Sequence, residues 1–176
     1  MKKNLFFILF FLLNINNAYS LIEVDITRGN LNPLPIAVSP LFSDSDTKQE
    51  LKNETNISKL GEKISEVVEN NLRRTGLFNP LEKNAFLQNP DVAHLKPRFE
   101  DWKLIKAQAL ITGQVKFVDE KLRVEFRLWD VLAAKELMAL AFTTVPENWR
   151  RVGHIISDKI YERLTGAVSY THIRAH

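Results

Sequence analysis

The sequence predicts an α+β domain in which a mixed β-sheet carries helices packed on one face. Residues 109–144 contain three consecutive runs of alternating apolar and polar side chains, a period-2 pattern that is typical of strands. Residues 57–75 and 144–166 instead repeat apolar side chains at helical spacing. Because further strand-like runs precede both helical segments, the order of elements favours helices layered on a sheet.

The first twenty residues have the organisation of an export signal. Lys2 and Lys3 precede an unbroken apolar run over residues 5–13, and the small residues Ala18 and Ser20 follow. A membrane anchor is the alternative, but a helix that spans a bilayer needs about 20 apolar residues, more than this run contains. We therefore expect residues 1–20 to be a signal peptide that is cleaved between Ser20 and Leu21.

The segment after the expected cleavage site alternates apolar and polar side chains. Ile22, Val24 and Ile26 lie on one face of an extended chain. Such a strand can pair within the domain's own sheet, or it can bind a partner by strand addition. The spacing alone favours pairing within the domain, with binding to a partner as the alternative.

Residues 36–42 form an apolar run that predicts a buried strand, and the polar residues 43–56 predict a loop. Residues 57–75 predict a helix that ends at Gly76, where a left-handed residue is favoured. The apolar face of this helix is Ile57, Leu60, Ile64, Val67, Val68 and Leu72.

The residues between this helix and the three alternating runs show less regular spacing of apolar side chains. Residues 77–87 predict a short strand and a turn, and residues 88–97, with two prolines, predict a surface loop. Residues 99–108 predict a short helix with Trp102 on its inner side.

Residues 109–118, 122–130 and 136–144 predict three strands joined by short links, and therefore an antiparallel meander. The last helix is expected to begin near Thr144, because Thr144 and Glu147 have the spacing of a capping box. Gly166 is expected to end it. Its apolar face is Trp149, Val152, Ile156, Ile160 and Leu164.

Composition excludes several classes of function. The sequence carries 24 Lys and Arg against 21 Asp and Glu, and Lys2, Lys3 and Arg174 account for the difference. The remaining chain is balanced, which argues against nucleic acid as a partner, since binding to phosphates needs clustered positive charge. The absence of cysteine excludes disulfides, thiol nucleophiles and cysteine zinc sites.

Catalytic motifs are not recognisable in the chain, and neither an enzyme nor a cofactor site is expected. One hypothesis to be tested is a metal-dependent hydrolase around His154 and Asp158, which lie four residues apart on one helix face. A third metal ligand is not evident, so a partly buried, hydrogen-bonded structural histidine is favoured. Ser157 cannot complete a triad with His154 and Asp158, because adjacent helical positions point about 100° apart.

Three stretches of the sequence resemble the amino-terminal domain of the TolB family: IEVDITRGNLNPLPIAVSPLF, ITGQVKFVDEKLRVEFRLWDV and ENWRRVGHIISDKIYERLTG. The resemblance covers roughly residues 22–166. It implies a periplasmic protein of the Tol-Pal system that is not an enzyme. It also implies an α/β domain over residues 33–166, similar in fold to tRNA anticodon-binding domains, which is followed in the family by a β-propeller.

The resemblance also implies the partners. The family links TolA of the inner membrane to Pal of the outer membrane, and takes part in outer-membrane invagination during cell division and in outer-membrane integrity. Residues 21–32 would bind the carboxy-terminal domain of TolA, whereas Pal binds the propeller. We expect a monomer, with the TolA-binding residues Leu21, Ile22, Glu23, Val24, Asp25, Ile26, Thr27, Arg28, Gly29 and Asn30.

Residues 167–176 depart from the family pattern, and we expect them to be a non-native or truncated tail, with the propeller absent. An alternative function is a stand-alone periplasmic binding domain for a small envelope ligand. It predicts a concave pocket lined by Trp102, Trp129 or Trp149.

Overall fold

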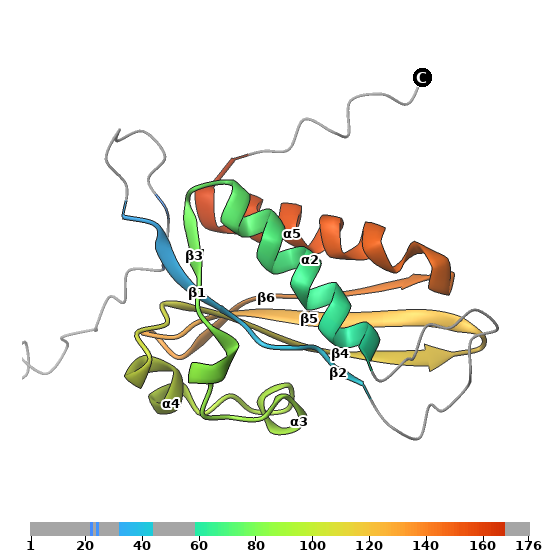
Figure 1. The fold of residues 1–176 in the computed structure, drawn as a ribbon, viewed down its shortest axis with the longest axis horizontal. Helices are drawn as coiled ribbons and strands as arrows, with labels where there is room; N and C mark the ends of the chain where they lie inside the picture. The colour runs from blue at the N-terminus through green and yellow to red at the C-terminus, as the bar shows by residue number, and fades with distance from the viewer. Residues whose placement is uncertain (1–21, 23, 25–31, 44–58, 168–176) are drawn as a thin grey trace, which may run out of the picture.

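Figure 1 shows a computed structural model that describes Ile22, Val24 and residues 32–43 and 59–167. No helix in these ranges is both long and apolar enough to cross a membrane. The elements are β1 (Leu34–Val38), β2 (Phe42–Ser43), α2 (Leu60–Arg74), β3 (Phe78–Pro80), η2 (Lys83–Ala85), α3 (Pro90–Ala93), α4 (Phe99–Leu104), β4 (Ala109–Val118), β5 (Lys121–Asp130), β6 (Lys135–Thr144), η3 (Pro146–Asn148) and α5 (Trp149–Thr165).

The strands form one mixed sheet in the order β3-β1-β4-β5-β6, with β2 also paired to β4. β1 runs parallel to β3 and β4, and β2 runs parallel to β4. β4, β5 and β6 form the predicted antiparallel meander. Whether two strands pair parallel or antiparallel depends on how they are connected. A short turn joins antiparallel neighbours, whereas α2 carries the chain back so that β3 runs parallel to β1. The predicted α+β class with a mixed sheet is confirmed.

The two long helices, α2 and α5, lie over one face of the sheet, and the short helices α3 and α4 lie on the other side (Figure 1). The main core fills the space between the long helices and the sheet. It consists of Val24, Leu34, Ile36, Val38, Leu41, Leu60, Ile64, Val68, Leu72, Phe78, Ala109, Ile111, Val115, Leu122, Val124, Phe126, Leu128, Val152, Ile156, Ile160 and Leu164. A second core on the opposite face consists of Ala37, Ala93, Trp102, Ala107, Leu110 and Val131.

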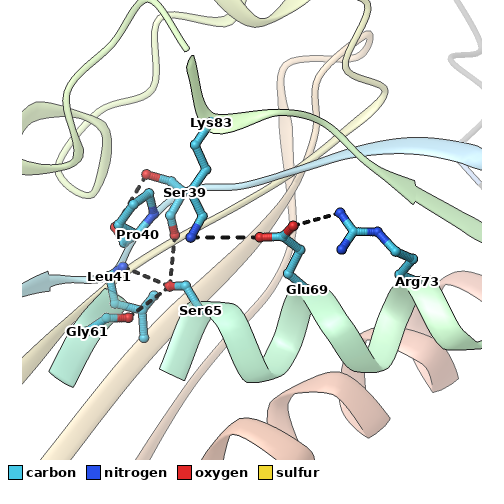
Figure 2. A network of polar contacts seen from close by, with 8 residues as sticks. All are labelled: Ser39, Pro40, Leu41, Gly61, Ser65, Glu69, Arg73 and Lys83. Atoms are coloured by element: carbon cyan, nitrogen blue, oxygen red, sulfur yellow. Dashed lines mark hydrogen bonds and ion pairs between the residues drawn. The ribbon is translucent and has the colours of Figure 1, made fainter. Parts of the chain in front are cut away.

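The connection between β1 and β2 is fixed to α2 by Ser65. The Ser65 hydroxyl accepts a hydrogen bond from the Leu41 backbone N–H at 3.0 Å, and its oxygen lies 3.1 Å from the Ser39 carbonyl oxygen (Figure 2). One turn earlier, Gly61 faces the Leu41 backbone so closely that a Cβ would overlap it. A larger residue at position 61 would therefore push the helix away from the sheet.

Three local predictions were wrong. The run over residues 36–42 is not one strand, because Pro40, which has no N–H to donate, separates β1 from β2. Residues 88–97 are not simply a surface loop, since they contain α3 and the buried Gln88. Thr144 does not cap a helix. It is the last residue of β6, and the side chain that reaches it is that of Asn148, at 3.3 Å.

Candidate functional site

Two residues of the expected partner-binding segment are docked on the domain. The Ile22 backbone N–H donates to Asp130 Oδ2 at 3.1 Å, and the Val24 backbone N–H donates to the Leu164 carbonyl at 2.7 Å. Val24 is 9% exposed and belongs to the main core, and Ile22 packs against that core. Ile22 and Val24 are therefore held both by their backbone and by their apolar side chains.

Asp130 lies at the end of β5 and positions the segment with its carboxylate. Its side chain is 2% exposed, and each oxygen accepts one backbone hydrogen bond. Oδ1 accepts from the N–H of Ala133 at 2.9 Å, within the turn to β6, and Oδ2 accepts from Ile22. Because a buried polar group is costly without hydrogen-bond partners, these two backbone N–H groups satisfy the side chain, which in turn links Ile22 to the turn before β6.

Leu164 contributes the second anchor from the last turn of α5. The last carbonyl groups of a helix have no partner within the helix and need another donor. The Val24 N–H donates to the Leu164 carbonyl. Gly166, in the left-handed conformation with φ 67°, donates its N–H to the Glu162 carbonyl. The end of α5 thus offers a backbone acceptor to an extended chain.

The docking matches the sequence expectation in part. The side chains of Ile22 and Val24 both turn inward, as the alternation predicts, but neither residue belongs to a strand of the sheet. The other expected partner-binding residues and the Ser20–Leu21 junction lie outside the described residues, namely Leu21, Glu23, Asp25, Ile26, Thr27, Arg28, Gly29 and Asn30.

Sequence reasoning missed Asp130 and Leu164 as the acceptors for this segment. One pattern pointed to Asp130. Leu122, Val124, Phe126 and Leu128 are the inward positions of β5, and Asp130 continues their period-2 spacing. A carboxylate on the apolar face of a strand needs a donor, so its position predicts a hydrogen-bonding role.

A groove of about 430 Å³ lies on the sheet face opposite α2 and α5. On its floor Glu125 accepts hydrogen bonds from Arg123 Nε at 2.7 Å and from Gln114 Nε2 at 2.6 Å. These two bonds lower the pKa of the Glu125 carboxyl below its ordinary value, and the bond from Arg123 has the larger effect. The groove is lined by His94, Leu95, Gly113, Gln114, Arg123, Glu125, Phe126, Arg127, Ala139, Leu140 and Ala141.

None of the three tryptophans lines this groove. Trp102 is 1% exposed, and its indole Nε1 donates to Gln88 Oε1 at 3.1 Å. Trp129 is half-buried and donates to Thr112 Oγ1 at 2.9 Å. Trp149 packs against the main core, and the guanidinium carbon of Arg150 lies 4.6 Å from its ring centroid. In the described part of the chain, the groove that the structure shows is therefore not the tryptophan-lined pocket expected for an envelope ligand.

The pair proposed as metal ligands is engaged differently. The Asn71 side-chain amide donates to His154 Nδ1 at 2.8 Å and to Ser157 Oγ at 3.1 Å. The histidine is thus hydrogen-bonded, as sequence analysis favoured, but it is exposed and not partly buried as expected. Across residues 32–43 and 59–167, no three His, Asp or Glu side chains lie close enough together to hold a metal ion.

The fold and the docked residues define a class of protein: a small α+β domain in which Ile22 and Val24, which precede β1, bind back onto β5 and α5. The family model of the TolB amino-terminal domain matches residues 22–137. The chain therefore belongs to the TolB amino-terminal domain family.

Individual relatives agree. The Tol-Pal system protein TolB of Pelagibacter ubique (strain HTCC1062) is 73% identical over 164 residues, which are 93% of this chain and 36% of the relative. The chain thus spans about a third of that relative's length. The crystal structure of TolB from Acinetobacter baumannii matches with a TM-score of 0.61 and 23% identity, over 84% of this chain and 32% of that one.

A second solved structure shares the fold. The hypothetical protein CT253 from Chlamydia trachomatis matches with a TM-score of 0.51 and 10% identity, over 77% of this chain and 100% of that one. At such identities the two structures show the fold alone.

Proposed function

We propose that this chain is the TolA-facing part of a periplasmic TolB protein of the Tol-Pal system. Residues 21–32 would bind the carboxy-terminal domain of TolA after the signal peptide has been cleaved between Ser20 and Leu21. Family membership and the Pelagibacter relative support this assignment. In this role the chain binds other proteins and catalyses no reaction.

One observation carries the proposal: both described residues of the segment, Ile22 and Val24, bind the domain through backbone N–H groups and inward apolar side chains. Ile22 and Val24 each give one backbone hydrogen bond to the domain, and one of their acceptors is a side chain rather than a strand. Alternate backbone N–H groups and alternate apolar side chains are also what a partner binds when it accepts an added strand. A partner can therefore replace these contacts with equivalent ones.

The wider role follows from the family. A TolB protein would connect TolA at the inner membrane with Pal at the outer membrane, and so take part in outer-membrane invagination during division and in outer-membrane integrity. The chain spans 36% of the Pelagibacter relative, and we propose that a Pal-binding propeller would lie in the part that it does not span. This domain would act as a monomer and supply the TolA side of the connection.

Calorimetric titration with the TolA carboxy-terminal domain tests the proposal. The chain beginning at Leu21 is expected to bind, and the chain without residues 21–32 is expected to show no binding heat. As a matched control, removal of residues 168–176 should leave the affinity unchanged. Equal affinity with and without residues 21–32 would exclude this segment as the TolA-binding element.

A further inference from the structure

β6 (Lys135–Thr144) is the last strand of the sheet order within the described part of the chain. It is ten residues long, and Ala139, Leu140 and Ala141 near its middle are exposed. A long exposed edge strand offers its backbone N–H and C=O groups to another extended chain. The side chains beside this edge therefore decide which extended chain fits it.

Three rows of side chains cross from β5 to β6 on the groove face of the sheet. The register partners in these rows are Arg127 with Ala139, Glu125 with Ala141 and Arg123 with Thr143. All of them except Thr143 line the groove, whose volume of about 430 Å³ falls within the usual range of binding pockets. Because the β6 side chains are short, the long side chains of β5 can extend over β6 toward the sheet edge.

The charged side chains of β5 are accessible from this groove. Those of Arg123, Glu125 and Arg127 are 43%, 33% and 46% exposed. Arg123 Nε lies 2.7 Å from Glu125 Oε1, and Arg127 Nε lies 3.6 Å from Glu136 Oε2. A guanidinium has five N–H donors, so each arginine can bind a further carboxylate through its terminal N–H groups. Lys116, the register partner of Arg123 in β4, adds positive charge to that row. The charges along β5 thus alternate positive, negative, positive.

We propose that β6 and the groove bind an extended segment of a partner protein, by addition of a strand at the sheet edge. The segment would carry an acidic, a basic and an acidic side chain at three alternate positions. Neighbouring strands lie about 4.8 Å apart, so these side chains would meet Arg127, Glu125 and Arg123 across β6. Charge complementarity selects this occupant. Neither Asp130 nor Leu164 belongs to this site, which is therefore independent of the docking of Ile22 and Val24.

Peptides of one composition test the order of charges. One peptide has the sequence Thr-Glu-Thr-Lys-Thr-Glu-Thr, and two controls move the Lys to the first or the last charged position. Each is added to the ¹⁵N-labelled chain that begins at Leu21, and the amide signals of β6 are followed by NMR. The first peptide should bind about fivefold more tightly than either control, since the controls can form at most two of the three cross-strand charge pairs. Absence of binding, or equal affinity for the three peptides, would overturn the proposal.

A charge exchange within the chain gives the reciprocal test. Arg123→Glu together with Glu125→Arg keeps the net charge and the pairing of opposite charges along β5, but changes the order in the three rows to positive, positive, negative. One of the two control peptides should then form all three charge pairs and bind more tightly than the first peptide. An unchanged preference for the first peptide would show that these side chains do not select the segment.

Backbone pairing is tested separately with N-methylated peptides. The N–H groups of successive residues in an extended chain point to opposite sides, so only one alternate set can face β6. Two forms of the first peptide are compared, one methylated at its three charged residues and the other at the Thr residues between them. Only one of the two forms should lose its affinity. A loss in both forms, or in neither, would exclude strand addition.

Discussion

Gly153 of α5 lies directly against Val67 of α2. A Cβ on Gly153 would be 2.8 Å from Val67 Cγ1 and 3.0 Å from Val67 Cβ, both closer than side chains normally approach. The third near atom is the Ile64 carbonyl oxygen, at 3.4 Å. The two long helices therefore owe their close approach at this point to the missing side chain.

Gly153→Ala should lower the free energy of unfolding by about 1 to 3 kcal/mol, because the added methyl group overpacks the helix interface. Urea denaturation followed by circular dichroism measures the change. The control is Asp158→Ala on the exposed face of the same helix, which should stay within about 0.5 kcal/mol of the parent chain. If Gly153→Ala were as stable as the control, α2 and α5 would be able to move apart enough for a methyl group without loss of stability.

Ser65 and Ser157 form a matched pair of buried helix serines, since each hydroxyl bonds the carbonyl oxygen four residues earlier, at 3.0 Å and 2.8 Å respectively. Only Ser65 also satisfies a buried backbone N–H, that of Leu41. Ser65→Ala should therefore cost about 1 to 3 kcal/mol, the penalty for a buried donor without an acceptor.

Ser157→Ala should cost less than Ser65→Ala. The group it deprives is the side-chain amide of Asn71, a partly exposed residue that can bond to water instead. Guanidinium denaturation of both variants gives the comparison. Similar losses would show that the bond to Leu41 contributes little to stability.

Gln88 holds the second core together through three hydrogen bonds. Its Oε1 accepts from the Trp102 indole and from the Arg98 backbone N–H, and its Nε2 donates to the Lys96 carbonyl at 3.0 Å. Gln88→Leu leaves these groups without partners and should lower the free energy of unfolding by at least about 2 kcal/mol.

Gln108→Leu is the control for Gln88→Leu. Gln108 is half-buried, and its side chain makes no hydrogen bond with the described part of the chain. Thermal unfolding of the two variants, read by tryptophan fluorescence, should show a clear decrease for Gln88→Leu alone. Equal decreases would argue against the polar contacts as the cause.

Arg123→Met should raise the pKa of Glu125 toward its ordinary value of 4.5, because the Arg123 hydrogen bond is the largest cause of the lowering. Gln114→Met removes the second cause and should raise the pKa by less. Carboxyl ¹³C NMR titration measures both. Arg127→Met is the control, since Arg127 pairs with Glu136 at 3.6 Å rather than with Glu125.

The sign of the linked stability effect follows from the lowered pKa. Glu125 contributes stability that is fully present above pH 4.5 and is lost as the pH falls through the lower folded-state pKa. The contribution is reduced by solvent screening, since about a third of the side chain is exposed. The Arg123→Met chain should lose less stability over this range than the parent chain does.

Local patterns were sufficient to predict β4, β5, β6 and most of α2 and α5. Their side chains repeat at periods that depend only on neighbours along the chain, and short turns fix the meander. The parallel pairing of β1 with β3 and β4 could not be predicted in this way, since it joins segments far apart in sequence.

In the candidate site, the docked segment could be predicted from the sequence, but its acceptors on the domain could not. The alternation of Ile22 and Val24 identified the segment and its inward face, whereas the acceptors on Asp130 and Leu164 are set by how the tertiary fold brings the ends of β5 and α5 together. Gln88 was missed for a similar reason. Its side chain bonds the indole of Trp102, which lies on α4, 14 positions later in the chain.

The separation between Ile22 and Asp130 has a consequence for the order of events during biogenesis. The two residues are 108 positions apart, so Ile22 is synthesised long before its acceptor and cannot dock until Asp130 has been made. Contacts this distant in sequence form late in folding. Ile22 and Val24 are therefore undocked early in synthesis, and their docking reports that β5 and α5 have been made.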